Sequence, residues 1–88
     1  FIHDLYPEAK IHILGIPKMP VVDFSDFIVR SDKEEVQHLF YKIQDIVKEL
    51  GIDRSGYRII MNSGNHGGQE IPHFHVHILG GEKLKGVK

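Results

Sequence analysis

The chain has 88 residues, of which 11 are basic and 12 acidic, and its formal net charge is −1 with no cysteine. This length accommodates one domain over residues 1–88 and not two, and the charge balance excludes a strongly basic surface for nucleic acid or an anionic membrane. No apolar run approaches the roughly 20 residues that cross a bilayer, and the absence of cysteine excludes disulfide bonds and thiolate zinc sites and fits a reducing cytoplasm.

The N-terminal residues predict two strands and a loop. Residues 1–5 have the pattern of a strand end, so the chain opens inside an element and we expect an N-terminal piece of the domain to be missing. Residues 10–16 are apolar and rich in β-branched side chains, which predicts a strand. Pro17 and Pro20 exclude regular structure between them.

The middle of the chain contains the clearest helix. Residues 21–29 are ambiguous, and we expect a short extended piece or a turn around their Asp-Phe-Ser-Asp sequence. Residues 31–50 predict a long helix, with Ser31 as N-cap and Glu34 completing a capping box. Gly51 suits the left-handed position after the helix. The apolar face comprises Val36, Leu39, Phe40, Ile43, Val47 and Leu50.

The C-terminal third predicts two neighbouring antiparallel strands. Residues 57–62 and 71–79 have strand patterns, and the loop 63–70 between them contains glycines. Gly80-Gly81 ends the second strand. Together the elements predict an α+β domain in which an antiparallel meander sheet carries one long helix packed on it.

Three of the seven histidines lie at alternate positions of the last predicted strand. Side chains two residues apart in a strand point to the same face, at spacings of roughly 6.5–7 Å. We therefore expect His73, His75 and His77 on one face, with the intervening apolar residues packed under the helix. Strand propensity alone would favour Thr or Val at such positions, so the pattern indicates a shared chemical role.

Two kinds of chemistry fit this face. Two of the imidazoles together with His12 could bind one zinc or copper ion, whereas three consecutive same-face positions span about 13 Å, too far for one ion. In the catalytic interpretation, a neutral imidazole, with an ordinary pKa of about 6.5, attacks phosphorus. A second histidine then protonates a leaving amine or alkoxide, and N–H groups of the glycine loop bind phosphate oxygens.

A known family carries the same pattern. The stretch His73-Phe74-His75-Val76-His77-Ile78-Leu79 matches the motif His-φ-His-φ-His-φ-φ, where φ is apolar, and through it the chain resembles the histidine triad (HIT) superfamily. Residues 67–81 resemble the Hint branch, and Gln69-Glu70 resembles its bacterial purine nucleoside phosphoramidases. Residues 4–18 and 56–62 resemble the strands before the motif, so the resemblance covers almost the whole chain.

The resemblance implies a HIT-like fold, here lacking its N-terminal strand and helix, and a homodimer that binds purine mononucleotides such as AMP or GMP derivatives. It implies a hydrolase that cleaves the bond at the α-phosphate of a purine nucleoside phosphoramidate through a nucleotidyl-histidine intermediate, with no cofactor or metal required. Two alternatives stay open: a dinucleoside polyphosphate hydrolase of the Fhit type and a non-catalytic, nucleotide-binding regulatory module.

Carried over residue by residue, the resemblance implies a catalytic set of four histidines. His75 is the nucleophile, and His77 contacts the phosphate and helps to protonate the leaving group. The carbonyl of His73 orients the His75 ring. His12 matches the upstream histidine that joins this cluster.

The resemblance also implies a set of nucleotide-binding residues. Asp4 holds the ribose hydroxyls, a plausible task for a carboxylate acceptor. Asn62 lies near the phosphate and leaving group, and Gly68 and Gln69 belong to the phosphate loop. The remaining positions are Ile2 and Leu5, against the base, and Glu70, which stands where some relatives carry a Ser that contacts the leaving group.

Overall fold

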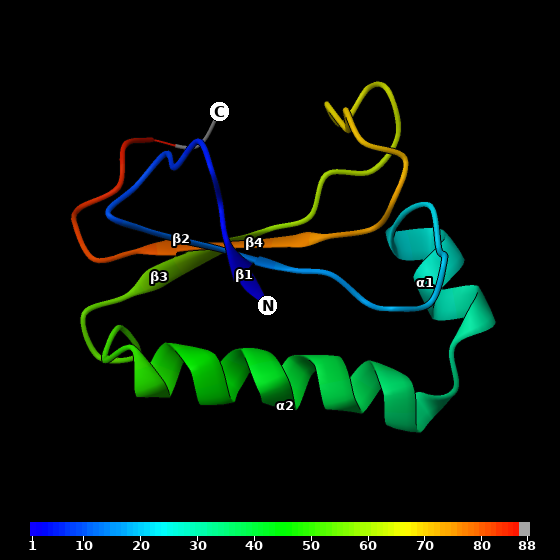
Figure 1. Cartoon of the computed structure of the whole chain (residues 1–88), viewed down its shortest axis with the longest axis horizontal. Helices are drawn as coiled ribbons and strands as arrows, with labels where there is room; N and C mark the ends of the chain where they lie inside the picture. Colours follow the sequence, from blue (N-terminus) through cyan, green and yellow to red (C-terminus); the bar gives the residue numbers. More distant parts are fainter. Residues whose placement is uncertain (87–88) are drawn as a thin grey trace.

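Four strands form one antiparallel sheet, in the order β1-β2-β4-β3, in the computed structural model, which describes residues 1–86. The strands are β1 (Ile2–His3), β2 (Ile11–Gly15), β3 (Tyr57–Ile60) and β4 (Val76–Gly80). The helices α1 (Phe24–Arg30) and α2 (Lys33–Glu49) connect β2 to β3. Helix α2 runs along one face of the sheet, and α1 lies at the end where β4 begins (Figure 1). Within residues 1–86, no helix is long and apolar enough to cross a bilayer.

The predicted α+β class, with an antiparallel sheet and a long helix, is confirmed. The strand order differs from a simple meander, because β4 lies between β2 and β3 rather than at an edge. Burial explains the arrangement. β4 has buried Val76, Ile78 and Leu79, whereas Tyr57 and Ile59 of β3 are each 38% exposed. The most apolar strand therefore takes the central position, where it is covered on both sides.

The two faces of the sheet differ in chemistry. Ile13 of β2 and Ile78 of β4 are paired in the register, and both are buried on the face that α2 covers. Leu39, Ile43 and Val47 complete this core from the helix, which confirms the centre of the predicted apolar face. Figure 1 shows that α2 covers one face of the sheet only. His12 and His77 alternate with Ile13 and Ile78 along their strands, so their side chains lie on the opposite face.

The ambiguous segment 21–29 contains a helix, α1. Asp23 is its N-cap, and the Asp23 carboxylate accepts the Asp26 N–H at 2.9 Å. The expected extended piece or turn is therefore wrong, because the Asp-Phe-Ser-Asp residues form the start of a helix. Phe27 is 3% exposed and stacks on Phe74, with ring centroids 4.9 Å apart. This contact links residues far apart in the sequence, so the local pattern did not reveal the helix.

The long helix is confirmed, but its cap lies one residue later than predicted. Ser31 closes α1, because its N–H bonds back to the last turn of that helix. Asp32 is the N-cap of α2, and Asp32 and Glu35 exchange capping-box hydrogen bonds of 2.8 and 3.0 Å. The predicted capping box of Ser31 and Glu34 is therefore wrong. At the C-terminal end, Gly51 has the expected positive φ, 73°.

The last strand begins later than predicted. β4 starts at Val76, because Pro72 has no N–H to offer a sheet and the Phe74 N–H bonds to the Val21 carbonyl at 2.9 Å, outside the sheet. The alternation continues through this extended segment. Phe74, Val76 and Ile78 are all 0% exposed, and the histidines between them are half-buried. The predicted segregation of the two sets of side chains is thus confirmed without a continuous strand.

Replacing Asp32 with Ala is expected to lower the free energy of unfolding by about 1 kcal/mol, because the N-cap and its capping box are lost. Ser31→Ala is expected to change it by less than about 0.5 kcal/mol. Urea denaturation of both variants against the wild type measures the difference. Equal losses in the two variants would contradict the assignment of Asp32 as the cap.

Candidate functional site

A cavity of about 460 Å³ is lined by His12, Leu14 and His77, on the sheet face opposite α2. Its lining includes all the predicted site residues except Ile2 and Leu5. β2 contributes His12, β4 contributes His77, and the extended segment before β4 contributes His73 and His75. Residues distant in the sequence thus meet in one cavity, as the resemblance implied.

The ring of His75 has one nitrogen fixed by the main chain. Its Nδ1 lies 2.8 Å from the carbonyl oxygen of His73. A carbonyl can only accept, so Nδ1 carries the proton and donates it. Nε2 of the neutral His75 ring therefore keeps its lone pair. The contact that the resemblance implied between these two residues is present, and it leaves one nitrogen available for attack.

A second hydrogen-bonded chain fixes the ring of His77. The Glu8 N–H donates to Nδ1 of His12 at 3.1 Å, so the proton of neutral His12 is on Nε2. That nitrogen lies 2.8 Å from Nδ1 of His77 and 3.4 Å from Oδ2 of Asp4. His12 therefore donates to His77, and the proton of neutral His77 is on Nε2. His77 presents an N–H donor, whereas His75 presents a lone pair.

The surroundings of His77 favour its neutral form. Burial lowers the pKa of His77 below its ordinary value of 6.5, and the neighbouring His75 and His12 lower it further. The ring centroids lie 4.9 Å from His75 and 5.1 Å from His12, so a positive charge on more than one ring is unfavourable. Asp4 and Glu8 act in the opposite direction and offset part of this lowering.

The ring of His73 contacts the loop that follows β2 rather than the other histidine rings. Its Nε2 lies 3.1 Å from the Pro17 carbonyl, which accepts the proton of that nitrogen. The next residue, Phe74, is fully buried against Phe27. Together these two anchors fix the main chain of His73, whose carbonyl holds the His75 ring.

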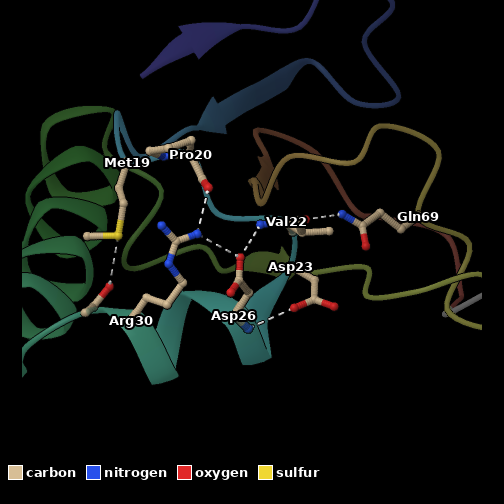
Figure 2. Close-up of polar contacts among 8 residues, drawn as sticks. Met19, Pro20, Val22, Asp23, Asp26, Arg30 and Gln69 are labelled. Atoms are coloured by element: carbon tan, nitrogen blue, oxygen red, sulfur yellow. Dashed lines mark hydrogen bonds and ion pairs between the residues drawn. The ribbon is translucent and has the colours of Figure 1, made fainter.

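Two amide side chains hold the glycine loop. Asn62 donates through Nδ2 to the Gly67 carbonyl at 2.9 Å. Oε1 of Gln69 accepts the Gly64 N–H at 2.9 Å, and its Nε2 donates to the Val22 carbonyl at 2.6 Å (Figure 2). Both predicted nucleotide-binding residues therefore shape the loop with their side chains. Gly68, with a φ of 75°, takes a backbone conformation that favours glycine.

The residues predicted to contact the sugar and the base lie only partly in the cavity. Oδ1 of Asp4 accepts the Tyr6 N–H at 2.7 Å, and its Oδ2 faces His12, so Asp4 is already part of the histidine cluster. Ile2 and Leu5 are 56% and 87% exposed and lie outside the cavity lining. Their contacts with a base stay a prediction. Glu70 lines the cavity and is exposed.

Sequence reasoning missed several contributors. Leu14 of β2 and Ile16, directly after it, line the cavity, and their alternation with His12 was a signal that could have found them. The Glu8 N–H and the Pro17 carbonyl had no such signal. Every residue has a main-chain carbonyl and every residue except proline has an N–H, so only the tertiary structure identifies the ones that bind a histidine.

The side chains of Asp4, His12 and His77 form a group that could hold a metal ion, with ligand atoms within 4.8 Å of one another. This set differs from the expected pair of triad histidines with His12. Two nitrogens bound tetrahedrally to one zinc ion lie roughly 3.3 Å apart. The His12 and His77 nitrogens are 2.8 Å apart and share a proton, so a metal would have to displace that proton and separate the rings.

A second cavity of about 790 Å³ opens on the β3 side of His77. Glu8, Asn62 and His77 line both cavities. The other charged residues of the second cavity are the basic Arg58, Lys83 and Lys85 and the acidic Glu82. His77 therefore lies between the histidine cluster and a space large enough for a further chemical group.

Comparisons with known proteins agree with this geometry. The HIT domain family model matches residues 1–84. An uncharacterised HIT-like protein of Rickettsia prowazekii is 49% identical over 84 residues, which cover 96% of this chain and 70% of that protein. The purine nucleoside phosphoramidase of Escherichia coli is 37% identical over 81 residues, covering 92% of this chain and 67% of the enzyme.

Solved structures agree as well. A histidine triad protein from Clostridium difficile superposes with a TM-score of 0.84 at 43% identity, covering 98% of this chain and 74% of that protein. A HIT family hydrolase from Legionella pneumophila superposes with a TM-score of 0.86 at 31% identity, covering 94% and 73%. The match of the family model over nearly the whole chain, together with this histidine cluster, shows that the chain belongs to the histidine triad family of HIT-domain proteins.

Proposed function

We propose that the protein hydrolyses purine nucleoside phosphoramidates at the α-phosphate through a nucleotidyl intermediate on His75. The observation that carries the proposal is the hydrogen bond of 2.8 Å from Nδ1 of His75 to the His73 carbonyl. It leaves the lone pair on Nε2 in a side chain that lines the cavity. The name of the Escherichia coli relative, a purine nucleoside phosphoramidase, supports this substrate class.

In the first step, Nε2 of His75 attacks the α-phosphorus, and the bond between phosphorus and the leaving amine breaks. The amine must gain a proton, and His77 supplies it from Nε2 in its imidazolium form. In that form Nδ1 of His77 also carries a proton, so His12 accepts it through Nε2 and carries its own proton on Nδ1, in place of the resting arrangement. The phosphate anion favours that form when substrate binds, because a nearby negative charge raises the pKa of a histidine. His77 is neutral after the transfer, and the leaving amine departs.

In the second step, water attacks the phosphorus of nucleotidyl-His75. The first step leaves His77 with its proton on Nδ1 and a lone pair on Nε2, and this Nε2 accepts a proton from the water. The bond between phosphorus and Nε2 of His75 then breaks, and the nucleotide is released. The His73 carbonyl accepts the Nδ1 proton of His75 and so stabilises the positive charge that the ring carries as an intermediate. The histidines return to their starting states, so no cofactor is consumed.

His75→Ala is expected to abolish turnover of an adenosine phosphoramidate while AMP binding persists, because the nucleophile is lost and the rest of the cavity remains. Mass spectrometry of the full-length protein after brief exposure to substrate, with acid-labile adducts preserved, measures the adenylyl increment. The matched control is His38→Ala, which removes an exposed histidine of α2.

The outcomes of this experiment separate the alternatives. An adenylyl increment in the wild type and in His38→Ala, but not in His75→Ala, supports covalent catalysis by His75. Wild-type protein that binds AMP without turnover would instead favour the nucleotide-binding regulatory module. Faster turnover of a diadenosine polyphosphate than of the phosphoramidate would favour the Fhit-type activity.

The His77 ring is expected to titrate below pH 6.5 in the free protein, since burial and two neighbouring histidines lower its pKa. AMP is expected to raise it, because the phosphate favours the imidazolium. Proton NMR titration with and without AMP measures both values. A free-protein titration at or above pH 6.5 would contradict the structure.

The same shift has a consequence for stability. A pKa that is lower in the folded state than in the unfolded state means that folding is favoured above pH 6.5 and that this contribution is lost as the pH falls through the folded value. His77→Gln, which cannot titrate, is expected to lack this part of the acid sensitivity of the urea midpoint.

We also propose that the full-length protein is a homodimer. β1 and β3 are the two edges of the sheet, and an uncovered edge offers unpaired main-chain groups to another chain. The β3 edge also exposes Tyr57 and Ile59, each at 38%. Light scattering at micromolar concentration is expected to give twice the mass of one chain, and a monomeric mass would refute the proposal.

A further inference from the structure

The segment Pro17–Val22, hereafter the proline segment, lies between the catalytic residues and α1. Its carbonyls accept three hydrogen bonds from the catalytic side, donated by the His73 ring, the Phe74 main chain and the Gln69 side chain. The distances are 3.1 Å to Pro17, 2.9 Å to Val21 and 2.6 Å to Val22, in that order. The proline segment therefore contacts both the residue that orients His75 and the glycine loop.

The proline segment is itself fixed from the far side. Asp26 of α1 accepts the Val22 N–H through Oδ2 at 2.8 Å, and Arg30 donates to the Pro20 carbonyl at 3.1 Å. Arg30 and Asp26 also form an ion pair of 3.6 Å (Figure 2). The side chains of these two residues are 51% and 27% exposed, so their pairing adds little to stability. Its effect is on the position of the two main-chain groups.

Gln69 joins the glycine loop to this support. The side-chain oxygen of Gln69 accepts the Gly64 N–H, and the main-chain N–H of Gln69 donates to the Gly64 carbonyl at 3.0 Å. These two hydrogen bonds connect the two ends of the loop. Nε2 of Gln69 donates to the Val22 carbonyl and to the Ile71 carbonyl, the latter at 3.0 Å. Both Nε2 protons and one lone pair are used. Only an amide provides an acceptor and two donors in this arrangement.

We propose that Gln69 is a positioning residue for the reaction, and that Asp26 and Arg30 of α1 act with it by fixing the proline segment. The proposal rests on the phosphoramidase function above. Gln69 fixes the position of the glycine loop relative to His75, and the proline segment fixes the position of the His73 carbonyl. Neither Asp26 nor Arg30 lines the cavity, so their influence on turnover passes through the proline segment.

The decisive variant is Gln69→Glu. Its carboxylate keeps an acceptor for the Gly64 N–H but faces the Val22 and Ile71 carbonyls without a donor, so the loop is expected to move away from the proline segment. We expect kcat for an adenosine phosphoramidate to fall about 10–100-fold, since misplacement by about 1 Å has effects of this size. KM is expected to change less than about threefold, because the residues predicted to bind the sugar and the base, Asp4, Ile2 and Leu5, lie outside the glycine loop.

Two further variants test the outer part of the support. Arg30→Met is expected to lower kcat by a smaller factor than Gln69→Glu, and Arg30→Lys, which keeps a donor for the Pro20 carbonyl, is expected to restore it. Glu35→Ala is the matched control. It removes a capping bond of α2 and lowers thermal stability, but it touches neither the cavity nor the proline segment, so kcat is expected to remain at the wild-type value.

A second measurement, on the full-length protein, separates this inference from the proposed function. NMR detects the Nδ1 proton of His75 and the amide proton of Gly64, both hydrogen-bonded in the wild type. In Gln69→Glu we expect faster solvent exchange of the His75 proton and a shifted Gly64 signal. If the wild type lacks turnover while these changes occur, the proposed function fails and the positioning role stands.

When the wild type turns over the substrate, two results would overturn the inference. One is wild-type turnover with an unchanged kcat and unchanged NMR signals in Gln69→Glu. The other is a reduced kcat with both signals unchanged, because Gln69 would then act on the substrate directly and not through the loop and His75. If neither turnover nor an NMR change is observed, both proposals fall.

Discussion

The burial of three alternate side chains is the constraint on which this structure depends. Phe74, Val76 and Ile78 have no exposed surface. Burial of such side chains contributes roughly 1.5–3 kcal/mol each, whereas a hydrogen bond at the site contributes about 0.5–1.5 kcal/mol. The apolar residues therefore decide which way the segment faces. The intervening histidines emerge on the sheet face that α2 does not cover, including His75.

Main-chain groups then determine which nitrogen of each histidine ring carries the proton. An amide N–H can only donate and a carbonyl can only accept, whatever the pH, so both fix the tautomer of a neutral ring more reliably than another titratable side chain. The Glu8 N–H donates to Nδ1 of His12, so the proton of His12 is on Nε2, and His12 in turn donates to Nδ1 of His77. The His73 carbonyl accepts from Nδ1 of His75, so the proton of His75 is on Nδ1 and its lone pair is on Nε2. One ring becomes a donor and its neighbour an acceptor, although the two side chains are chemically identical.

The support of the site extends beyond the cavity. The proline segment joins α1 to the catalytic residues through main-chain carbonyls, and Gln69 joins it to the glycine loop. The pairing of Asp26 and Arg30 is exposed and contributes little to stability, yet it fixes groups on which the geometry of the site depends. Stability and positioning therefore come from different residues: the former from the apolar core and the latter from weak polar contacts around it.

The sequence by itself determined the features that depend on neighbouring residues. The period-2 alternation around His75 separated the apolar and imidazole side chains correctly, and the residues 31–50 indicated the long helix and its glycine end. Only the tertiary structure decided α1, the central place of β4, and the pairing of His12 with His77. These features depend on where main-chain groups and distant side chains meet. Nearly every residue carries the same main-chain N–H and carbonyl, proline lacking only the N–H, so no local pattern encodes which of them become partners.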